Sequence, residues 1–248
     1  METIKKIVIE SKKKLYKDHD CLFVIVGPEG SGKSHLMMNI LDIYNPNSKI
    51  SDISMNAKDF VRSLRHMKRY GNPVFDEAGD GLYSREAMGG FNRLLNKTYM
   101  AIRGLNLFTI LVLPDFFDLD SYFRKHRVKG LFQVYKRGSV KFWNKRQIEY
   151  INIYCDKTRQ ITQKPSVYDT FPIYKGHLAE QYKELKLQKI KETLNNLDGN
   201  LDPIANLPAK TQISYLLKLN LTPLEITKLN KFDRTYVYEI ARKLKQEA

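Results

Sequence analysis

Eight consecutive residues near the start of the sequence have the types and the spacing of a phosphate-binding loop. Residues 27–34 read Gly-Pro-Glu-Gly-Ser-Gly-Lys-Ser, which fits the pattern G-x-x-x-x-G-K-[ST] in full. Glycines allow backbone N–H groups to surround phosphate oxygens, and the positive end of a following helix points at them. Lys33 would reach the β and γ phosphates of ATP, and the Ser34 hydroxyl would hold Mg²⁺. The expected nucleotide contacts are Gly27, Pro28, Glu29, Gly30, Ser31, Gly32, Lys33, Ser34 and His35.

A pair of acids follows a second, shorter apolar run. Residues 72–77 read Asn-Pro-Val-Phe-Asp-Glu, and we expect this run to form a core strand that ends beside the phosphate loop. Asp76 would carry Mg²⁺, directly or through water, and Glu77 would polarise the attacking water. This order of acids favours hydrolysis and weakens the hypothesis of a nucleotide or metabolite kinase. The alternatives are structural: a glycine-rich turn with an exposed lysine, and a plain acidic turn.

The elements around these motifs follow the pattern of an α/β protein. Residues 22–26 and 105–113 are apolar runs typical of strands buried on both faces. The spacing of apolar residues predicts helices over 33–45, around 60–67 and over 88–102. Strands that alternate with helices indicate a mostly parallel sheet flanked by helices. Beyond residue 131 we expect a β-hairpin with its turn near residues 136–139.

Four features of the sequence together resemble the additional-strand P-loop ATPases: the phosphate loop, the Asp76-Glu77 pair, the helix up to Ile102-Arg103-Gly104, and the strand that ends before Pro114. The chain is most similar to the branch that pumps DNA, which contains FtsK/HerA-type translocases, viral genome-packaging ATPases and the Zot-like proteins of filamentous phages. The resemblance covers about residues 20–135. It implies a P-loop NTPase fold with a RecA-like sheet, ATP hydrolysis, and assembly as a homo-oligomeric ring.

The same resemblance implies a role for Arg103. In the DNA-pumping branch, an arginine just before the fourth core strand acts in the catalytic site of a neighbouring subunit, and Arg103 has the matching place. Such an arginine finger stabilises charge on the transferred phosphoryl group. The alternative is a solvated arginine that the helix dipole favours at a helix end. The sequence departs from the family near the end of this strand, where Leu111-Val112-Leu113 stands in place of a polar sensor.

The charge of the chain points to a polyanionic partner. Among 248 residues, 42 Lys and Arg stand against 27 Asp and Glu, which leaves a net charge of +15. Nucleic acid is the expected partner, and a lysine-rich composition bias is the alternative. Cys21 and Cys155 form neither a disulfide framework nor a zinc site. Because the apolar runs are too short to span a membrane and the N-terminus lacks a signal-peptide pattern, we expect a folded cytoplasmic protein.

Residues 121–146 are the first candidate for binding double-stranded DNA. This stretch contains nine basic residues, six aromatic residues and no acid. Cations neutralise phosphates and exposed rings stack on bases, so Arg124, Lys125 and Arg127 are expected DNA contacts. The alternative is that the apolar residues of the hairpin form one buried face and leave the charges merely solvated: Phe132, Val134, Val140 and Phe142.

The C-terminal segment is the second candidate. Thr222-Pro223-Leu224-Glu225 is a capping box with proline at the first helical position, and apolar spacing predicts a further helix from about residue 233. With a helix expected over 211–219, the segment resembles a helix-turn-helix in size and apolar spacing. The resemblance implies DNA contacts from the last helix, at Arg234, Thr235, Tyr236, Arg242 and Lys243. The alternative is a three-helix module that docks a protein.

We therefore expect three parts: an ATPase domain with the basic hairpin over 1–176, a helix and linker over 177–208, and a DNA-binding module over 209–248. The leading hypothesis is an ATP-hydrolysing motor that packages, translocates or segregates viral or plasmid DNA. The rival hypothesis is an ATP-gated DNA-binding regulator with little hydrolysis.

Overall fold

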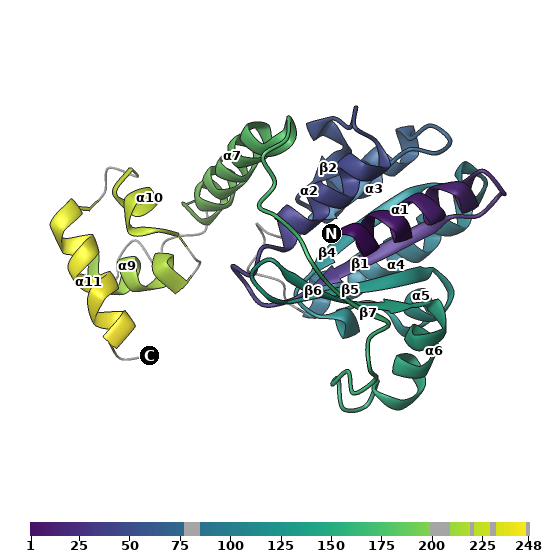
Figure 1. Ribbon diagram of the computed structural model, residues 1–248. Coiled ribbons are helices and arrows are strands. Elements are labelled where there is room, and N and C mark those ends of the chain that lie inside the picture. Colours follow the sequence, from purple (N-terminus) through teal and green to yellow (C-terminus); the bar gives the residue numbers. More distant parts are fainter. Residues whose placement is uncertain (77–84, 199–208, 219–220, 229–231, 247–248) are drawn as a thin grey trace. The chain divides into compact units, whose positions relative to one another are not determined.

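The computed structural model describes residues 1–76, 85–198, 209–218, 221–228 and 232–246 (Figure 1). The chain divides into two units, Met1–Lys189 and Ile190–Ala248. The boundary lies inside α7 (Leu178–Asp198), between the boundaries expected at 176/177 and 208/209. One helix therefore contributes residues to both units.

The first unit is built on a seven-stranded sheet with the strand order β2-β3-β4-β1-β5-β6-β7. The strands are β1 (Cys21–Val26), β2 (Ile53–Ser54), β3 (Val74–Asp76), β4 (Phe108–Leu113), β5 (Val128–Lys136), β6 (Ser139–Asn144) and β7 (Val167–Thr170). From β2 to β5 all neighbours are parallel, and β6 and β7 pair in antiparallel fashion. The expected α/β class, the two buried strands and the hairpin are confirmed. β4 separates β1 from β3, so one strand lies between the two strands that precede the motifs.

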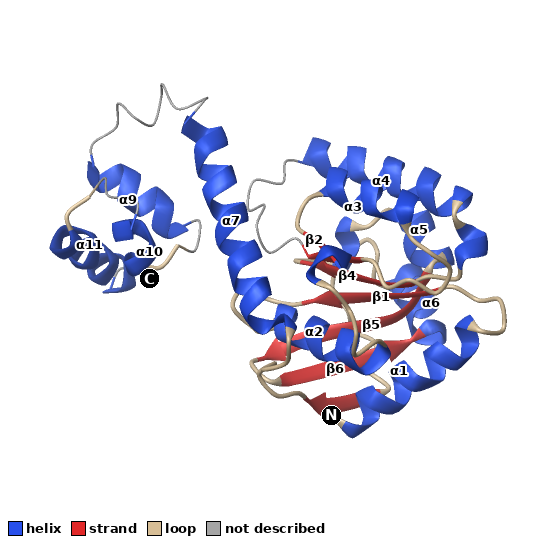
Figure 2. Cartoon of the chain, turned by 90° about the horizontal axis from the view of Figure 1, so that it is seen from above, coloured by secondary structure: helices blue, strands red, loops and turns tan. Residues whose placement is uncertain are grey.

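Helices cover both faces of this sheet (Figure 2). α1 (Glu2–Leu15) and α2 (Lys33–Tyr44) pack on one face, and the other face is covered by α3 (Ala57–His66), α4 (Arg85–Ala101), α5 (Ser121–His126) and α6 (Lys145–Tyr154). β1 shows why both layers are needed: Phe23 and Ile25 belong to the first core, whereas Leu22 and Val24 belong to the second. A strand that is apolar at every position must be buried on both faces.

Sequence reasoning did not identify α1. Its Ile4, Val8 and Leu15 are buried in the first core, although lysines occupy much of the rest of the helix. These residues have helical spacing, so the amphipathic pattern was available in the sequence. The mixture of charged and apolar residues in this segment is that of a surface helix with one buried face.

The second unit contains α9 (Ala209–Lys218), α10 (Pro223–Lys228) and α11 (Arg234–Gln246). Its small core is formed by Ile213, Leu221, Ile226, Val237 and Ile240. The expected capping box is present, because Thr222 N donates to Glu225 Oε2 (2.7 Å) and Glu225 N donates to Thr222 Oγ1 (3.3 Å). None of the helices in the described parts of either unit is both long and apolar enough to cross a membrane.

Candidate functional site

The segment that matches the phosphate-loop pattern connects the carboxyl end of β1 to α2, which begins at Lys33. Gly27 has φ 150°, and a Cβ atom at this position would lie 2.3 Å from the carbonyl oxygen of Val134 in β5. Gly32 is the N-cap of α2 and has φ 99°, in the left-handed region. Only glycine adopts both conformations without strain. These two glycines let the chain pass close to the sheet and turn directly into the helix, whose first N–H groups are left without helical acceptors.

Polar groups of this segment are turned inward. Lys33 Nζ donates hydrogen bonds to the carbonyl oxygens of Gly27 (2.6 Å) and Pro28 (3.0 Å). Two buried atoms, Ser31 Oγ and His35 Nδ1, have no hydrogen-bond partner among the described residues. Buried polar atoms almost always find a partner, so such atoms need a ligand or a water molecule to complete them. The segment thus has unpartnered polar atoms where a phosphate is expected.

Positive charge from other segments adds to that of the loop. Burial lowers the pKa of His35, and the nearby cations Arg137, Lys183 and Lys186 lower it further. Arg137 comes from the turn between β5 and β6, and the two lysines come from α7. The part of this shift that the three cations cause indicates positive potential beside the loop, which attracts anions.

Asp76, the last residue of β3, lies at the same edge of the sheet, and it is fully buried. Tyr182 of α7 joins it to the loop: its hydroxyl oxygen lies 2.6 Å from Asp76 Oδ2 and 2.9 Å from Ser34 Oγ. Burial raises the pKa of Tyr182 well above its usual value, and Asp76 raises it further. The structure therefore brings the two expected Mg²⁺ ligands to a single hydroxyl group.

The chemistry of this pair fits Mg²⁺, which binds oxygen ligands and is usually held by one or two protein groups together with phosphates and water. Ser34 and Asp76 supply one hydroxyl and one carboxylate at the edge where a loop-bound phosphate would lie. Within the described parts of the chain, no group of three or more His, Cys, Asp or Glu could hold a metal ion. An ion at Ser34 and Asp76 would therefore need oxygens from phosphate or water as well.

Sequence reasoning missed Tyr182. A helix was expected within 177–208, but Tyr182 is separated from Ser34 by 148 residues, so no local pattern connects the two. The available signal was the spacing of Leu178, Tyr182 and Leu185, which marks one face of α7 as apolar. This spacing predicts burial of the ring and gives no information on the partner of its hydroxyl.

The two other expected catalytic residues are not assembled with this site. Glu77 lies outside the described residues. Arg103 is exposed and begins the 3-10 turn before β4, at the edge of the sheet opposite the loop. β4 and β1 run parallel with Val26 beside Leu113, and six strand residues span about 20 Å. Arg103 therefore cannot reach the loop of its own chain and could act only on a second copy.

Arg124 does not have the surface position expected of a DNA contact. Its side chain is only 4% exposed. The guanidinium donates to the carbonyl oxygen of Leu119 (2.9 Å), to Asn152 Oδ1 (3.1 Å) and to Asp156 Oδ1 (2.5 Å). Arg124 is therefore a buried structural residue, because its helix turns it into the core between the 3-10 helix η3 (Phe116–Asp118) and α6 and not toward solvent.

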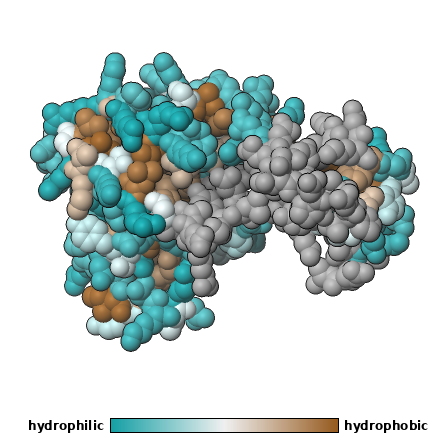
Figure 3. Space-filling view, turned by 180° about the vertical axis from the view of Figure 1, so that it is seen from behind, coloured by the Kyte–Doolittle hydropathy of each residue, from teal (hydrophilic) through white to brown (hydrophobic). Residues whose placement is uncertain are grey.

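The other residues of the basic stretch 121–146 differ in exposure. Lys125 is exposed, as expected, whereas Arg127 is half-buried with its Nη1 3.4 Å from Asp20 Oδ2. Two rings of the stretch, Tyr122 and Tyr135, are exposed. The apolar face proposed as the alternative is present, because four hairpin residues are buried in the first core: Phe132, Val134, Val140 and Phe142. On the face of the first unit seen in Figure 3, hydrophobic residues form separate areas within a mainly hydrophilic surface.

The expected contact residues of α11 are all exposed: Arg234, Thr235, Tyr236, Arg242 and Lys243. Val237 and Ile240, on the opposite side of the helix, are buried in the core of the second unit. Arg234 lies over the ring of Tyr238 (5.9 Å to its centre), and Lys243 Nζ pairs with Glu239 (2.7 Å). This helix thus presents cations and rings together on its solvent side.

The chain matches no protein-family model, and no curated protein is similar to it in sequence. The chemistry of the site therefore has to be argued from its own residues.

Proposed function

We propose that this protein binds and hydrolyses ATP with Mg²⁺ and uses the reaction to act on double-stranded DNA. The observation that carries the proposal is the meeting of Ser34 and Asp76 at one point beside the loop that contains Lys33. A hydroxyl, a buried carboxylate and a lysine at the start of a helix are the groups that phosphoryl transfer requires. A strand order in which β4 lies between β1 and β3 supports membership of the additional-strand class.

Each group has a distinct task in this proposal. The N–H groups at the start of α2 and the Lys33 ammonium bind the phosphates, for which Lys33 exchanges its carbonyl partners for phosphate oxygens. Bound by Ser34 and Asp76, Mg²⁺ would neutralise charge on the β and γ phosphates. Glu77, by its place after Asp76 in the sequence, would orient the attacking water.

The DNA part of the proposal rests on charge and exposure. The net charge of +15 favours a polyanion, and α11 exposes Arg234 and Arg242 beside tyrosine rings. A homo-oligomer, such as a ring, is part of the proposal because Arg103, acting as an arginine finger, would meet a phosphate only in a neighbouring copy.

The second candidate function is an ATP-gated DNA-binding regulator. It is favoured by the contacts of Tyr182 with both expected metal ligands, because a site that closes on itself without nucleotide gives the two states that a switch requires. The two functions differ in turnover, since a motor hydrolyses ATP repeatedly and is stimulated by DNA.

Nucleotide binding and turnover in the variant Lys33→Ala test the proposal. Loss of a charge-assisted hydrogen bond of roughly 3 kcal/mol should weaken binding of Mg²⁺-ATP about 100-fold, measured by calorimetry. Lys58→Ala, an exposed lysine of α3, is the matched control and should bind as the wild type does. Equal affinity of Lys33→Ala and wild type would contradict the nucleotide site. In the wild-type protein, ATP turnover that duplex DNA stimulates supports the motor. Binding of ATP without turnover supports the regulator.

A further inference from the structure

The hydroxyl of Tyr182 occupies the point that Ser34 and Asp76 share. A phenol has one proton and a carboxylate only accepts, so the hydroxyl donates to Asp76 Oδ2 (2.6 Å), and its oxygen can accept from Ser34 Oγ (2.9 Å). The Tyr182 side chain is only 6% exposed, and Asp76 is fully buried. The contact is therefore a closed, desolvated arrangement of three polar groups.

We propose that Tyr182 is a latch on the metal half of the site, which holds Ser34 and Asp76 to each other and withdraws when Mg²⁺-nucleotide binds. The inference rests on the proposed function. A cation held by both residues needs their oxygens at about 2.0–2.1 Å, facing the ion. In the structure the same oxygens face the phenol, so the hydroxyl and the ion compete for them. Tyr182 supplies a hydrogen bond to the buried Asp76 carboxylate in the closed state, which keeps this state stable without an ion.

Hydrogen bonds join the chain before Tyr182 to α2 and to the segment that follows α2, so the latch has a fixed base. Asn39 Nδ2 donates to the carbonyl oxygen of Pro172 (3.0 Å), and His177 Nε2 lies 2.8 Å from the carbonyl oxygen of Ser48. Leu178, the first residue of α7, is fully buried. Tyr182 lies one helical turn later, and its sequence neighbours Gln181 and Lys183 are exposed. Release of the hydroxyl therefore requires movement only from Tyr182 onward.

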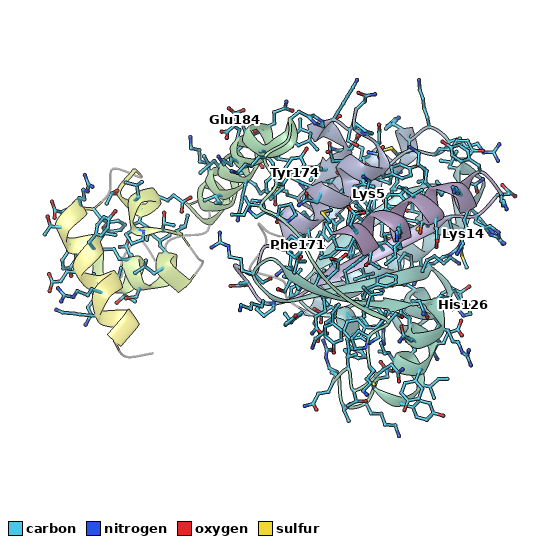
Figure 4. All side chains as sticks on the ribbon, viewed as in Figure 1. Lys5, Lys14, His126, Phe171, Tyr174 and Glu184 are labelled. Atoms are coloured by element: carbon cyan, nitrogen blue, oxygen red, sulfur yellow. The ribbon has the colours of Figure 1, made fainter. Side chains whose placement is uncertain are left out.

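The base of the latch also touches the loop. Phe171 is buried, and its ring lies 3.7 Å from the place of a Cβ atom on Gly32. Figure 4 shows Phe171 and Tyr174 on the segment that leads into α7, and Glu184 on α7 itself. The segment thus contacts the loop at Phe171 and the metal ligands at Tyr182. It has the contacts needed to respond to a ligand in the loop.

The helix that contains Tyr182, α7, contributes residues to both units. The helix continues without interruption to Asp198, and its Ile190 packs against the core of the second unit. Tyr182 is thus the residue of this helix that contacts the expected metal ligands, and the last residues of the same helix belong to the second unit.

The variant Tyr182→Phe tests the latch, because it removes only the hydroxyl and keeps the ring in the core. Closed and open states compete, so loss of the closing hydrogen bond should tighten binding of a fluorescent, non-hydrolysable ATP analogue about tenfold in the presence of Mg²⁺. In EDTA the affinity should not change. Tyr174→Phe is the matched control: its hydroxyl lies on the same segment, 3.5 Å from Asp42 Oδ1, and its loss should leave binding unchanged.

Each outcome is decisive. Equal affinity of Tyr182→Phe and wild type overturns the latch and leaves the nucleotide site standing. Weaker binding by the variant also overturns the latch, because Tyr182 would then assist the ion. Absence of binding by wild type and variant alike overturns the proposed function and the latch with it.

Hydrogen exchange on the wild-type protein gives a readout that needs no variant. Mg²⁺ and the analogue together should speed amide exchange several-fold at residues 182–189, whereas the analogue in EDTA should not. Unchanged or slower exchange over these residues on addition of Mg²⁺-nucleotide would contradict the withdrawal of Tyr182.

Discussion

The loop edge of the sheet in the first unit and the solvent side of α11 in the second unit are both rich in polar groups. They differ in burial: the polar groups at the loop edge are buried, and those on α11 are exposed. At the loop edge, Asp76 and Tyr182 are buried and bonded to each other. On α11, Arg234 and Arg242 are exposed. Buried groups interact strongly because water does not screen them, whereas exposed charges interact weakly and are screened further by salt.

The two regions should therefore respond differently to substitution. A change at the loop edge leaves an uncompensated group in a desolvated place, so its effect is large and specific. A change on α11 removes one of several solvated charges, so its effect is graded and depends on salt. Three residue sets test how far this contrast holds.

Arg103 gives the strongest test of this contrast. It is exposed, yet its proposed effect on ATP turnover is large. If Arg103 is buried against a phosphate only in the assembled oligomer, Arg103→Ala should lower ATP turnover about 10³- to 10⁵-fold. The exposed Arg65, near the end of α3, is the matched control, and Arg65→Ala should retain activity.

A mixing experiment makes this prediction more specific. Inactive Arg103→Ala protein mixed with inactive Glu77→Gln protein should recover part of the turnover, because some interfaces then pair an intact arginine with an intact glutamate. Full turnover by Arg103→Ala alone, or by a strict monomer at every concentration, would rule out action across an interface.

Arg124 and Lys125 test the contrast within a single helix. Removal of the Arg124 side chain leaves the Leu119 carbonyl and Asn152 without their buried partner, so Arg124→Ala should lower the free energy of unfolding by about 3 kcal/mol in a urea titration. The neighbouring Lys125 is exposed, and Lys125→Ala should change this free energy by less than about 0.5 kcal/mol. Equal effects of the two substitutions would contradict the buried role of Arg124.

Neutralisation of α11 should give the smallest effect per residue. Replacement of Arg234, Arg242 and Lys243 by Gln should weaken duplex DNA binding, and the slope of log affinity against log salt should fall by about 0.9 for each phosphate that is no longer neutralised. The matched control replaces three basic residues of the first unit: Lys125, Lys129 and Arg146. If the slope falls in the control and stays constant in the α11 variant, the DNA contacts lie in the first unit and not on α11.

Much of the first unit could be predicted because its signals are local. The apolar run at 22–26 became β1, the pattern after Lys33 became α2, and the turn near residue 138 joins β5 and β6. Capping at Thr222 and Glu225 was predictable for the same reason, since both partners lie within one helical turn. In each case the residues that decide the structure are close neighbours in the chain.

The parts that could not be predicted depend on distant segments. Tyr182 meets Asp76 across 106 residues, and Arg124 meets Asp156 across 32 residues. Arg124 and Lys125 are adjacent and both basic, yet one is buried and the other exposed. Composition treats them alike, and only the packing of α5 against α6 distinguishes them.

Side-chain type and spacing over a few residues were enough to predict most of the strands and helices, although not α1, as well as the glycine-rich turn before α2 and the basic net charge of the protein. Only the packing of remote segments decided that Ser34 and Asp76 meet at the Tyr182 hydroxyl, that Arg103 lies at the opposite edge of the sheet, and that Arg124 is withdrawn from solvent. The physical reason is that desolvation and distance depend on which remote segments pack together, and these two quantities set the strength of every polar interaction.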